Sequence, residues 1–133
     1  LFLQELSSCQ FVRNRQNVIM IGNPGRGKTH LAIALGLKAC TQGYRVLFKN
    51  AATLSTELCE AKDHYHLGKL ERTLAKADLL ILDEPTNHLD VNAVAQLKTA
   101  IRAFAGSVIF VSHSKEFCAE TADWTFDFET LFD

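Results

Sequence analysis

Residues 22–29 read Gly-Asn-Pro-Gly-Arg-Gly-Lys-Thr, which has the glycine, lysine and threonine spacing of a phosphate-binding loop. Glycines at these positions let backbone N–H groups turn inward around the α- and β-phosphates, and the amino end of a following helix adds partial positive charge. We expect Lys28 to reach the β- and γ-phosphates and to act as a catalytic residue, and the Thr29 hydroxyl to bind Mg²⁺. The predicted nucleotide-binding residues are Gly22, Asn23, Pro24, Gly25, Arg26, Gly27, Lys28, Thr29 and His30.

Two adjacent carboxylates are candidates for binding the metal ion and for orienting the attacking water. Asp83 and Glu84 close an apolar run, 55 positions after Lys28. We expect Asp83 to orient the magnesium ion and Glu84 to orient, or accept a proton from, the water that attacks the γ-phosphate. His113 follows another apolar run, and its imidazole is predicted to hydrogen-bond a γ-phosphate oxygen. The catalytic candidates are therefore Glu84, His113 and Lys28.

Alternating strands and helices are expected to position these groups. Strands are predicted at residues 17–21, 45–48, 77–83, 107–111 and 124–128, the last as an edge strand. Helices are predicted at 30–40, 51–61, around 67–74, at 91–104 and at 114–121. The helix at 30–40 is apolar nearly all round, which predicts that it is buried against the sheet. The pattern indicates an α/β fold, a three-layer P-loop NTPase sandwich with a mainly parallel sheet of roughly five strands.

Composition limits the other classes of function. The chain has 133 residues, 47% of them apolar, and we expect one domain over residues 1–133. Its 14 basic and 15 acidic residues give a net charge of −1, so no overall field attracts nucleic acid or an anionic membrane. No apolar run is long enough to span a bilayer, and the four cysteines lack a C-x-x-C pair. We expect a cytoplasmic protein with reduced thiols and no membrane partner.

The motifs also resemble two known families. Residues 1–84, including GNPGRGKTHLAIALGLKACTQGYRVLF and LAKADLLILDE, resemble the ATPase domain of IstB-like transposition proteins, relatives of DnaC-type helicase loaders. From about residue 79, LLILDEPTNHLDVNAVAQLKTAIRAFAGSVIFVSHSKEF resembles the end of an ABC-type ATPase, closest to ABC-F proteins. The resemblance implies a domain with an IstB-like half (residues 1–84) and an ABC-like half (residues 85–133). Natural recombination and deliberate fusion would both produce this chimera-like pattern.

The resemblance implies roles and partners for the site. It makes Glu84 the catalytic glutamate and His113 the switch histidine, and it favours ATP as the nucleotide. It also places an extra strand between the phosphate-loop strand and the magnesium-binding strand. The ABC signature segment and the downstream IstB arginines that complete such sites from a neighbouring domain have no counterpart here. The resemblance therefore implies a homo-oligomer as a candidate partner, and nucleic acid by family analogy only.

Three functions are compatible with these residues. The first is Mg-ATP binding with slow hydrolysis by a minimal P-loop domain, either natural or engineered. The second is a nucleotide- or phosphate-binding scaffold without productive turnover, and the third is a DNA-associated ATPase of transposition or helicase loading. For the base, Phe11 or Arg13 is a candidate to pack on adenine, with a core position as the equal alternative for Phe11.

Overall fold

Ten helices and strands follow one another along the part of the chain that the structure describes. A computed structural model describes residues 6–22, 27–63, 67–83, 91–112 and 123–127. The strands are β1 (Val18–Ile21), β2 (Val46–Asn50), β3 (Leu79–Asp83), β4 (Ser107–Ser112) and β5 (Trp124–Asp127). The helices are α2 (Gln10–Arg13), α3 (Lys28–Thr41), α4 (Ala51–Asp63), α5 (Leu67–Ala75) and α6 (Val91–Ala103).

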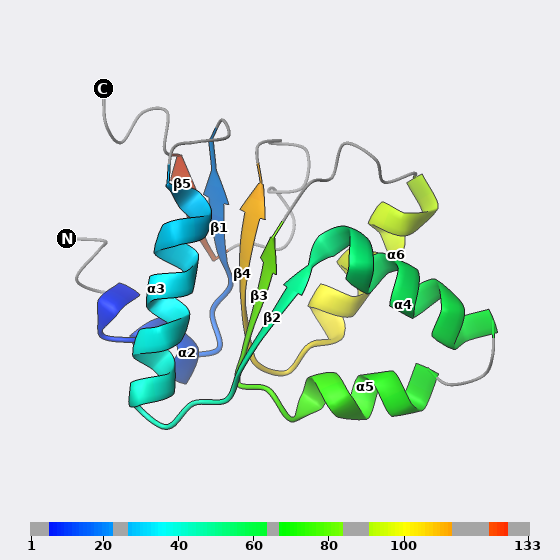
Figure 1. Cartoon of the computed structure of the whole chain (residues 1–133), viewed down its shortest axis with the longest axis horizontal. Coiled ribbons are helices and arrows are strands. Elements are labelled where there is room, and N and C mark those ends of the chain that lie inside the picture. Colours follow the sequence, from blue (N-terminus) through cyan, green and yellow to red (C-terminus); the bar gives the residue numbers. More distant parts are fainter. Residues whose placement is uncertain (1–5, 23–26, 64–66, 84–90, 113–122, 128–133) are drawn as a thin grey trace.

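The five strands form one sheet in the order β2-β3-β4-β1-β5. Every neighbouring pair in this order is parallel, which confirms the predicted parallel α/β architecture. Strand β4 lies between β1 and β3, as expected for the extra strand, and β5 lies at an edge. Because the strands are parallel, their carboxyl ends meet at one edge of the sheet and their amino ends at the opposite edge (Figure 1).

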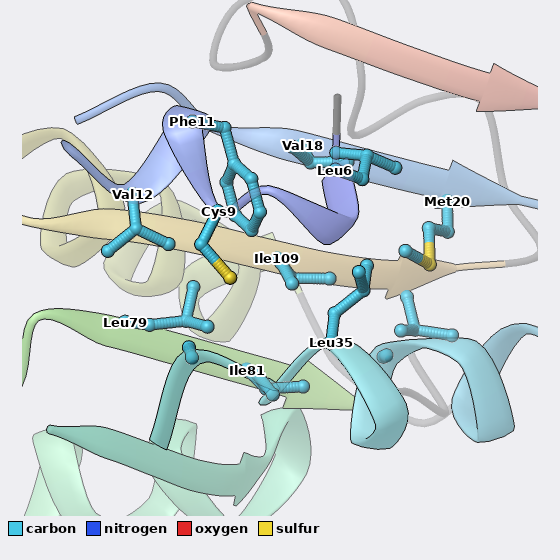
Figure 2. Close-up of a cluster of buried hydrophobic side chains, with 13 residues drawn as sticks. Leu6, Cys9, Phe11, Val12, Val18, Met20, Leu35, Leu79, Ile81 and Ile109 are labelled. Atoms are coloured by element: carbon cyan, nitrogen blue, oxygen red, sulfur yellow. The ribbon is translucent and has the colours of Figure 1, made fainter. Parts of the chain in front are cut away.

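Helices cover both faces of the sheet, with α3 on one side and α4 and α6 on the other (Figure 1). Successive strand residues point to opposite faces, so the apolar runs divide between two core clusters. Figure 2 shows the cluster on the α3 side, where α2 also contributes side chains. Its strand members are Val18, Met20, Leu79, Ile81, Ile109 and Val111. The cluster under α4 and α6 contains the alternate strand residues Ile19, Ile21, Leu80, Leu82, Val108 and Phe110.

Two details go beyond the sequence predictions. Helix α3 packs against the sheet as predicted, but on its outer side Ile33 is 44% exposed and Leu37 is 64% exposed. The sheet covers only one side of this helix, where Ala32, Leu35 and Ala39 are buried. The short helix α2 was not predicted, and it carries Phe11 into the core at 3% exposure (Figure 2). The structure therefore favours the core alternative for Phe11. Across the described ranges, no helix is long and apolar enough to cross a membrane.

Candidate functional site

The phosphate-loop region lies where β1 gives way to α3, at the carboxyl edge of the sheet. Gly27 is the N-cap residue of α3, with φ 85° in the left-handed region that favours glycine. Its carbonyl accepts the N–H of Leu31 at 2.9 Å, so the first helical turn is already formed. A helix start leaves its first N–H groups without helical partners, and α3 therefore directs donors and partial positive charge toward this edge.

The Lys28 side chain is buried at this edge, with 7% exposure. Its ammonium donates to the backbone carbonyl of Gly22 and, at 3.3 Å, to that of Ser112. The Ser112 carbonyl also accepts the N–H of Gly22 at 3.2 Å. The ammonium thus links the start of the phosphate loop to the end of β4, and it sits in a desolvated position where it would interact strongly with an anion.

Thr29 and Asp83 meet beside this lysine. The Thr29 hydroxyl donates to Oδ1 of Asp83 at 3.2 Å, joining the first turn of α3 to the end of β3. Asp83 is half-buried at the strand end. Two oxygen groups this close suit Mg²⁺, a hard ion that keeps several waters and takes one or two protein oxygens. Within the described ranges, no group of three or more His, Cys, Asp or Glu side chains offers a metal cage made by protein alone.

The structure brings part of the predicted site together. Gly22, Gly27, Lys28, Thr29 and Asp83 converge at the carboxyl edge through the contacts above. His30 lies on α3, and its side chain is exposed. The remaining predicted site residues fall outside the described residues: Asn23, Pro24, Gly25, Arg26, Glu84 and His113.

One member of the site was not predicted. The contact from the end of β4 to Lys28 comes from the Ser112 backbone carbonyl, whereas the residue predicted to act after this strand was His113, which lies outside the described residues. Every residue type has this carbonyl, so no sequence signal marks it. Only the strand order, with β4 beside β1, would have pointed to it.

Comparison with known proteins agrees with this geometry. The family described as "IstB-like ATP binding protein" matches residues 2–116. The chain is 39% identical over 126 residues to an insertion sequence IS21 putative ATP-binding protein of Pseudomonas aeruginosa, covering 92% of this chain and 45% of that protein. A shorter match, 46% identical over 55 residues, is to the probable ATP-binding protein YbiT of Escherichia coli O157:H7, and it covers 41% of this chain and 10% of that protein. The chain thus spans less than half the length of these relatives.

Two solved structures share the fold. Replication initiator DnaA bound to AMPPCP and single-stranded DNA superposes with a TM-score of 0.68 at 19% identity, over 92% of this chain and 44% of that one. The DnaC helicase loader superposes with a TM-score of 0.64 at 24% identity, over 84% of this chain and 69% of that one. At these identities the likeness concerns the fold, which is that of a P-loop NTPase.

Proposed function

The chain belongs to the IstB-like ATP-binding protein family, and on this premise we propose that it binds Mg-ATP at the carboxyl edge of the sheet and hydrolyses it slowly on its own. The observation that carries the proposal is the contact between Thr29 and Asp83 beside the buried Lys28 ammonium. A cation for the phosphates and an oxygen pair for the metal are the two protein elements that phosphoryl transfer requires at this position.

Each residue has a separate task in this proposal. Lys28 exchanges its carbonyl partners for β- and γ-phosphate oxygens, and the amino end of α3 supplies further N–H donors. Thr29 and Asp83 hold Mg²⁺, which, when bound, neutralises charge that develops on the phosphates. Glu84 orients the attacking water, and His113 hydrogen-bonds the γ-phosphate; both roles come from the sequence. For residues 22–27 the sequence motif alone supports the proposal that backbone N–H groups bind the phosphates.

We propose slow turnover because the described site residues, Lys28, Thr29 and Asp83, include no arginine that could contact the γ-phosphate. An arginine finger from a neighbouring subunit can raise phosphoryl-transfer rates about 10³- to 10⁵-fold. We propose that a second copy of the protein supplies such a contact, so that efficient hydrolysis requires a homo-oligomer. The isolated chain would then bind nucleotide well and release phosphate slowly.

We place this activity in DNA transposition. The support is the description of the P. aeruginosa relative as an insertion sequence ATP-binding protein. In this proposal the protein is cytoplasmic, which suits the free thiols of Cys9, Cys40 and Cys59.

We also propose that residues 1–133 form one domain in which an ABC-like half follows residue 84. The short match to YbiT supports this two-lineage origin. The IstB-like match runs on to residue 116, past the proposed junction, and supports an IstB-like ancestry for part of that half as well.

Binding and phosphate release, measured on the same preparations, test the function. Titration with Mg-ATP and a non-hydrolysable analogue should show binding, and turnover should stay well below the value of about 1 s⁻¹ at the lower end of typical enzymes. Asp83→Asn should weaken the magnesium-dependent part of binding. The matched control Asp78→Asn changes an exposed carboxylate at the other end of β3 and should have no effect.

The Glu84→Gln variant distinguishes an ATPase from a nucleotide-binding scaffold without turnover. If the domain is an ATPase, this substitution abolishes phosphate release and preserves binding. If release by the unmodified chain does not exceed that of Glu84→Gln, the protein is a nucleotide-binding scaffold without turnover. Failure to bind Mg-ATP at all would overturn both functions.

A further inference from the structure

The edge of the sheet opposite the nucleotide site forms a continuous surface of short loops. Because all strands are parallel, the segments that precede them lie together at the amino edge, where α2, α3, α5 and α6 also end (Figure 1). We call this surface the ledge. It consists of residues 14–17, 42–45, 76–78 and 104–107, the last turns of those four helices, and Asp123.

Hydrogen bonds join the loops of the ledge in the order of the strands. The N–H of Asp78 donates to the Arg45 carbonyl at 2.7 Å, and the Asp78 carbonyl accepts the N–H of Ser107 at 3.0 Å. The Ser107 hydroxyl donates to the Gln16 carbonyl. The next residue along, Asn17, accepts the N–H of Asp123 at 2.9 Å through its backbone carbonyl. Hydrogen bonds from backbone groups and from the Ser107 hydroxyl thus connect the loops of the ledge to one another.

Positive charge collects on this row although the whole chain has a net charge of −1. Seven exposed basic side chains belong to the ledge: Arg13, Arg15, Lys38, Arg45, Arg72, Lys76 and Arg102. Its exposed acidic residues are Asp78 and Asp123, and both carboxylates accept backbone N–H groups, of Arg45 at 2.8 Å and of Asn17 at 2.7 Å. These two carboxylates are held against the backbone, and the seven basic side chains are exposed.

Helix electrostatics explain only part of this charge. Cations stabilise the carboxyl ends of helices, and α2, α3, α5 and α6 each have a basic residue in the last turn. Arg15, Arg45 and Lys76 lie beyond those ends, in the loops that lead into β1, β2 and β3. Arg15 even occupies a left-handed conformation, with φ 55°, that favours glycine or asparagine. Arg45 lies four residues past the end of α3, where the electrostatics of the helix end no longer account for a cation.

We propose that the ledge binds the phosphodiester backbone of double-stranded DNA without reading its sequence. Strands lie about 4.8 Å apart, so the row from the loop before β2 to the loop before β1 spans about 14 Å. At about 3.4 Å of rise per phosphate on one DNA strand, this row faces about four phosphates. The exposed large apolar residues among the described ones lie on α3 and β2 rather than in the ledge loops, which disfavours a membrane as the partner.

Salt dependence of binding to a labelled duplex of mixed sequence tests the proposal. Each phosphate contact contributes about 0.9 to the slope of log affinity against log salt. The triple variant Arg15→Gln, Arg45→Gln, Lys76→Gln should therefore lower the slope by about 2.7. Three such contacts contribute an about 40-fold loss of affinity between 50 and 200 mM salt. The affinity of the triple variant should lack this contribution.

A matched control removes charge without touching the ledge loops. Lys69 is exposed in the first turn of α5, about 9 Å along the helix from Ala75. Lys69→Gln should leave the slope unchanged, whereas Arg45→Gln, with the same change in net charge, should lower it by about 1. If the triple variant does not fold, the slopes of Arg15→Gln, Arg45→Gln and Lys76→Gln are measured separately. Equal slopes for Lys69→Gln and all three single ledge variants would overturn the proposal.

The inference rests on the proposed function for the choice of DNA, and its test is separate from that of nucleotide binding. Lys28→Met should weaken binding of the ATP analogue and leave the salt slope of DNA binding unchanged. The ledge variants should lower that slope and bind the analogue as the unmodified chain does. Binding of the unmodified chain to phosphatidylserine vesicles but not to the duplex would contradict the proposal. Loss of analogue binding by every ledge variant would also contradict it, because the ledge would then act through the fold.

Discussion

Replacing Lys28 with methionine should weaken nucleotide binding about 100-fold while leaving the nucleotide-free fold almost as stable as before. The substitution keeps the unbranched stem of a side chain that is only 7% exposed, and it removes the ammonium. In the absence of nucleotide, hydrogen bonds to the Gly22 and Ser112 carbonyls are lost, but so is the desolvation cost of a buried cation, about several kcal/mol. The two effects oppose each other, so we expect the midpoint of unfolding to change little.

With nucleotide, the same substitution removes a charge-assisted contact from a desolvated site. Such a hydrogen bond contributes about 1.5–3 kcal/mol, and a loss of about 2.7 kcal/mol raises Kd about 100-fold. At a ligand concentration of about 100 Kd, the unmodified protein gains about 2.7 kcal/mol of stability, whereas the variant gains about 0.4 kcal/mol. For a domain of this size, these gains correspond to Tm shifts of roughly 10 °C and 2 °C.

Thermal unfolding with and without magnesium and a non-hydrolysable ATP analogue measures both effects together. Lys69→Met is the control, because it removes an exposed lysine from α5 and should retain the full shift. An equal analogue-induced shift in Lys28→Met and in the unmodified protein would show that the buried ammonium does not contact the phosphates.

Three further predictions concern the metal site, the packing and the alkaline stability. Thr29→Val should weaken magnesium-dependent analogue binding about tenfold, whereas Thr29→Ser should preserve it; equal titration curves would exclude the hydroxyl as a ligand. Gly106→Ala places a Cβ 2.5 Å from a backbone carbonyl and should lower the free energy of unfolding in urea by about 1–3 kcal/mol. Gly68→Ala, whose Cβ approaches only a guanidinium nitrogen at 4.0 Å, should not lower it. Burial raises the pKa of the Cys9 thiol above its ordinary value of 9.0, so stability should fall as the pH rises past the unfolded thiol pKa. Cys9→Ala should reduce this fall in Tm relative to the exposed-site control Cys40→Ala, and parallel Tm curves for the two variants would contradict it.

The strands were predictable because a sheet covered on both faces requires continuous apolar runs. Residues 79–82 and 108–111 are such runs, and both belong to strands of the sheet. The same argument correctly placed α3 against the sheet, but it did not describe the outer side of this helix. Ile33 and Leu37 are apolar, but nothing in the described part of the chain covers them as the sheet covers Leu35. An apolar helix predicts contact with a sheet, and it does not predict how much of the helix is enclosed.

The side-chain contacts of the candidate site were predictable from the sequence, and its backbone contacts were not. Lys28, Thr29 and Asp83 have the residue types and spacing that phosphate and magnesium require, and the structure brings them together. The Ser112 carbonyl has no residue-specific signal. The ledge was hidden for another reason, since its basic residues are scattered between Arg13 and Arg102 in a nearly neutral chain. Only parallel strand order gathers them at one edge.

Strand β4 connects residues 85–133 structurally to residues 1–84. It follows the proposed junction after residue 84, yet it pairs with β1 and β3, which precede that junction. Its alternate residues enter both core clusters, with Ile109 beside the α3 layer and Phe110 beside α4 and α6. Its last carbonyl accepts the Lys28 ammonium. A first half without β4 would therefore lack the centre of its sheet and one partner of its phosphate-binding lysine. Whatever the ancestry of the second half, we expect nucleotide binding at Lys28 to depend on β4.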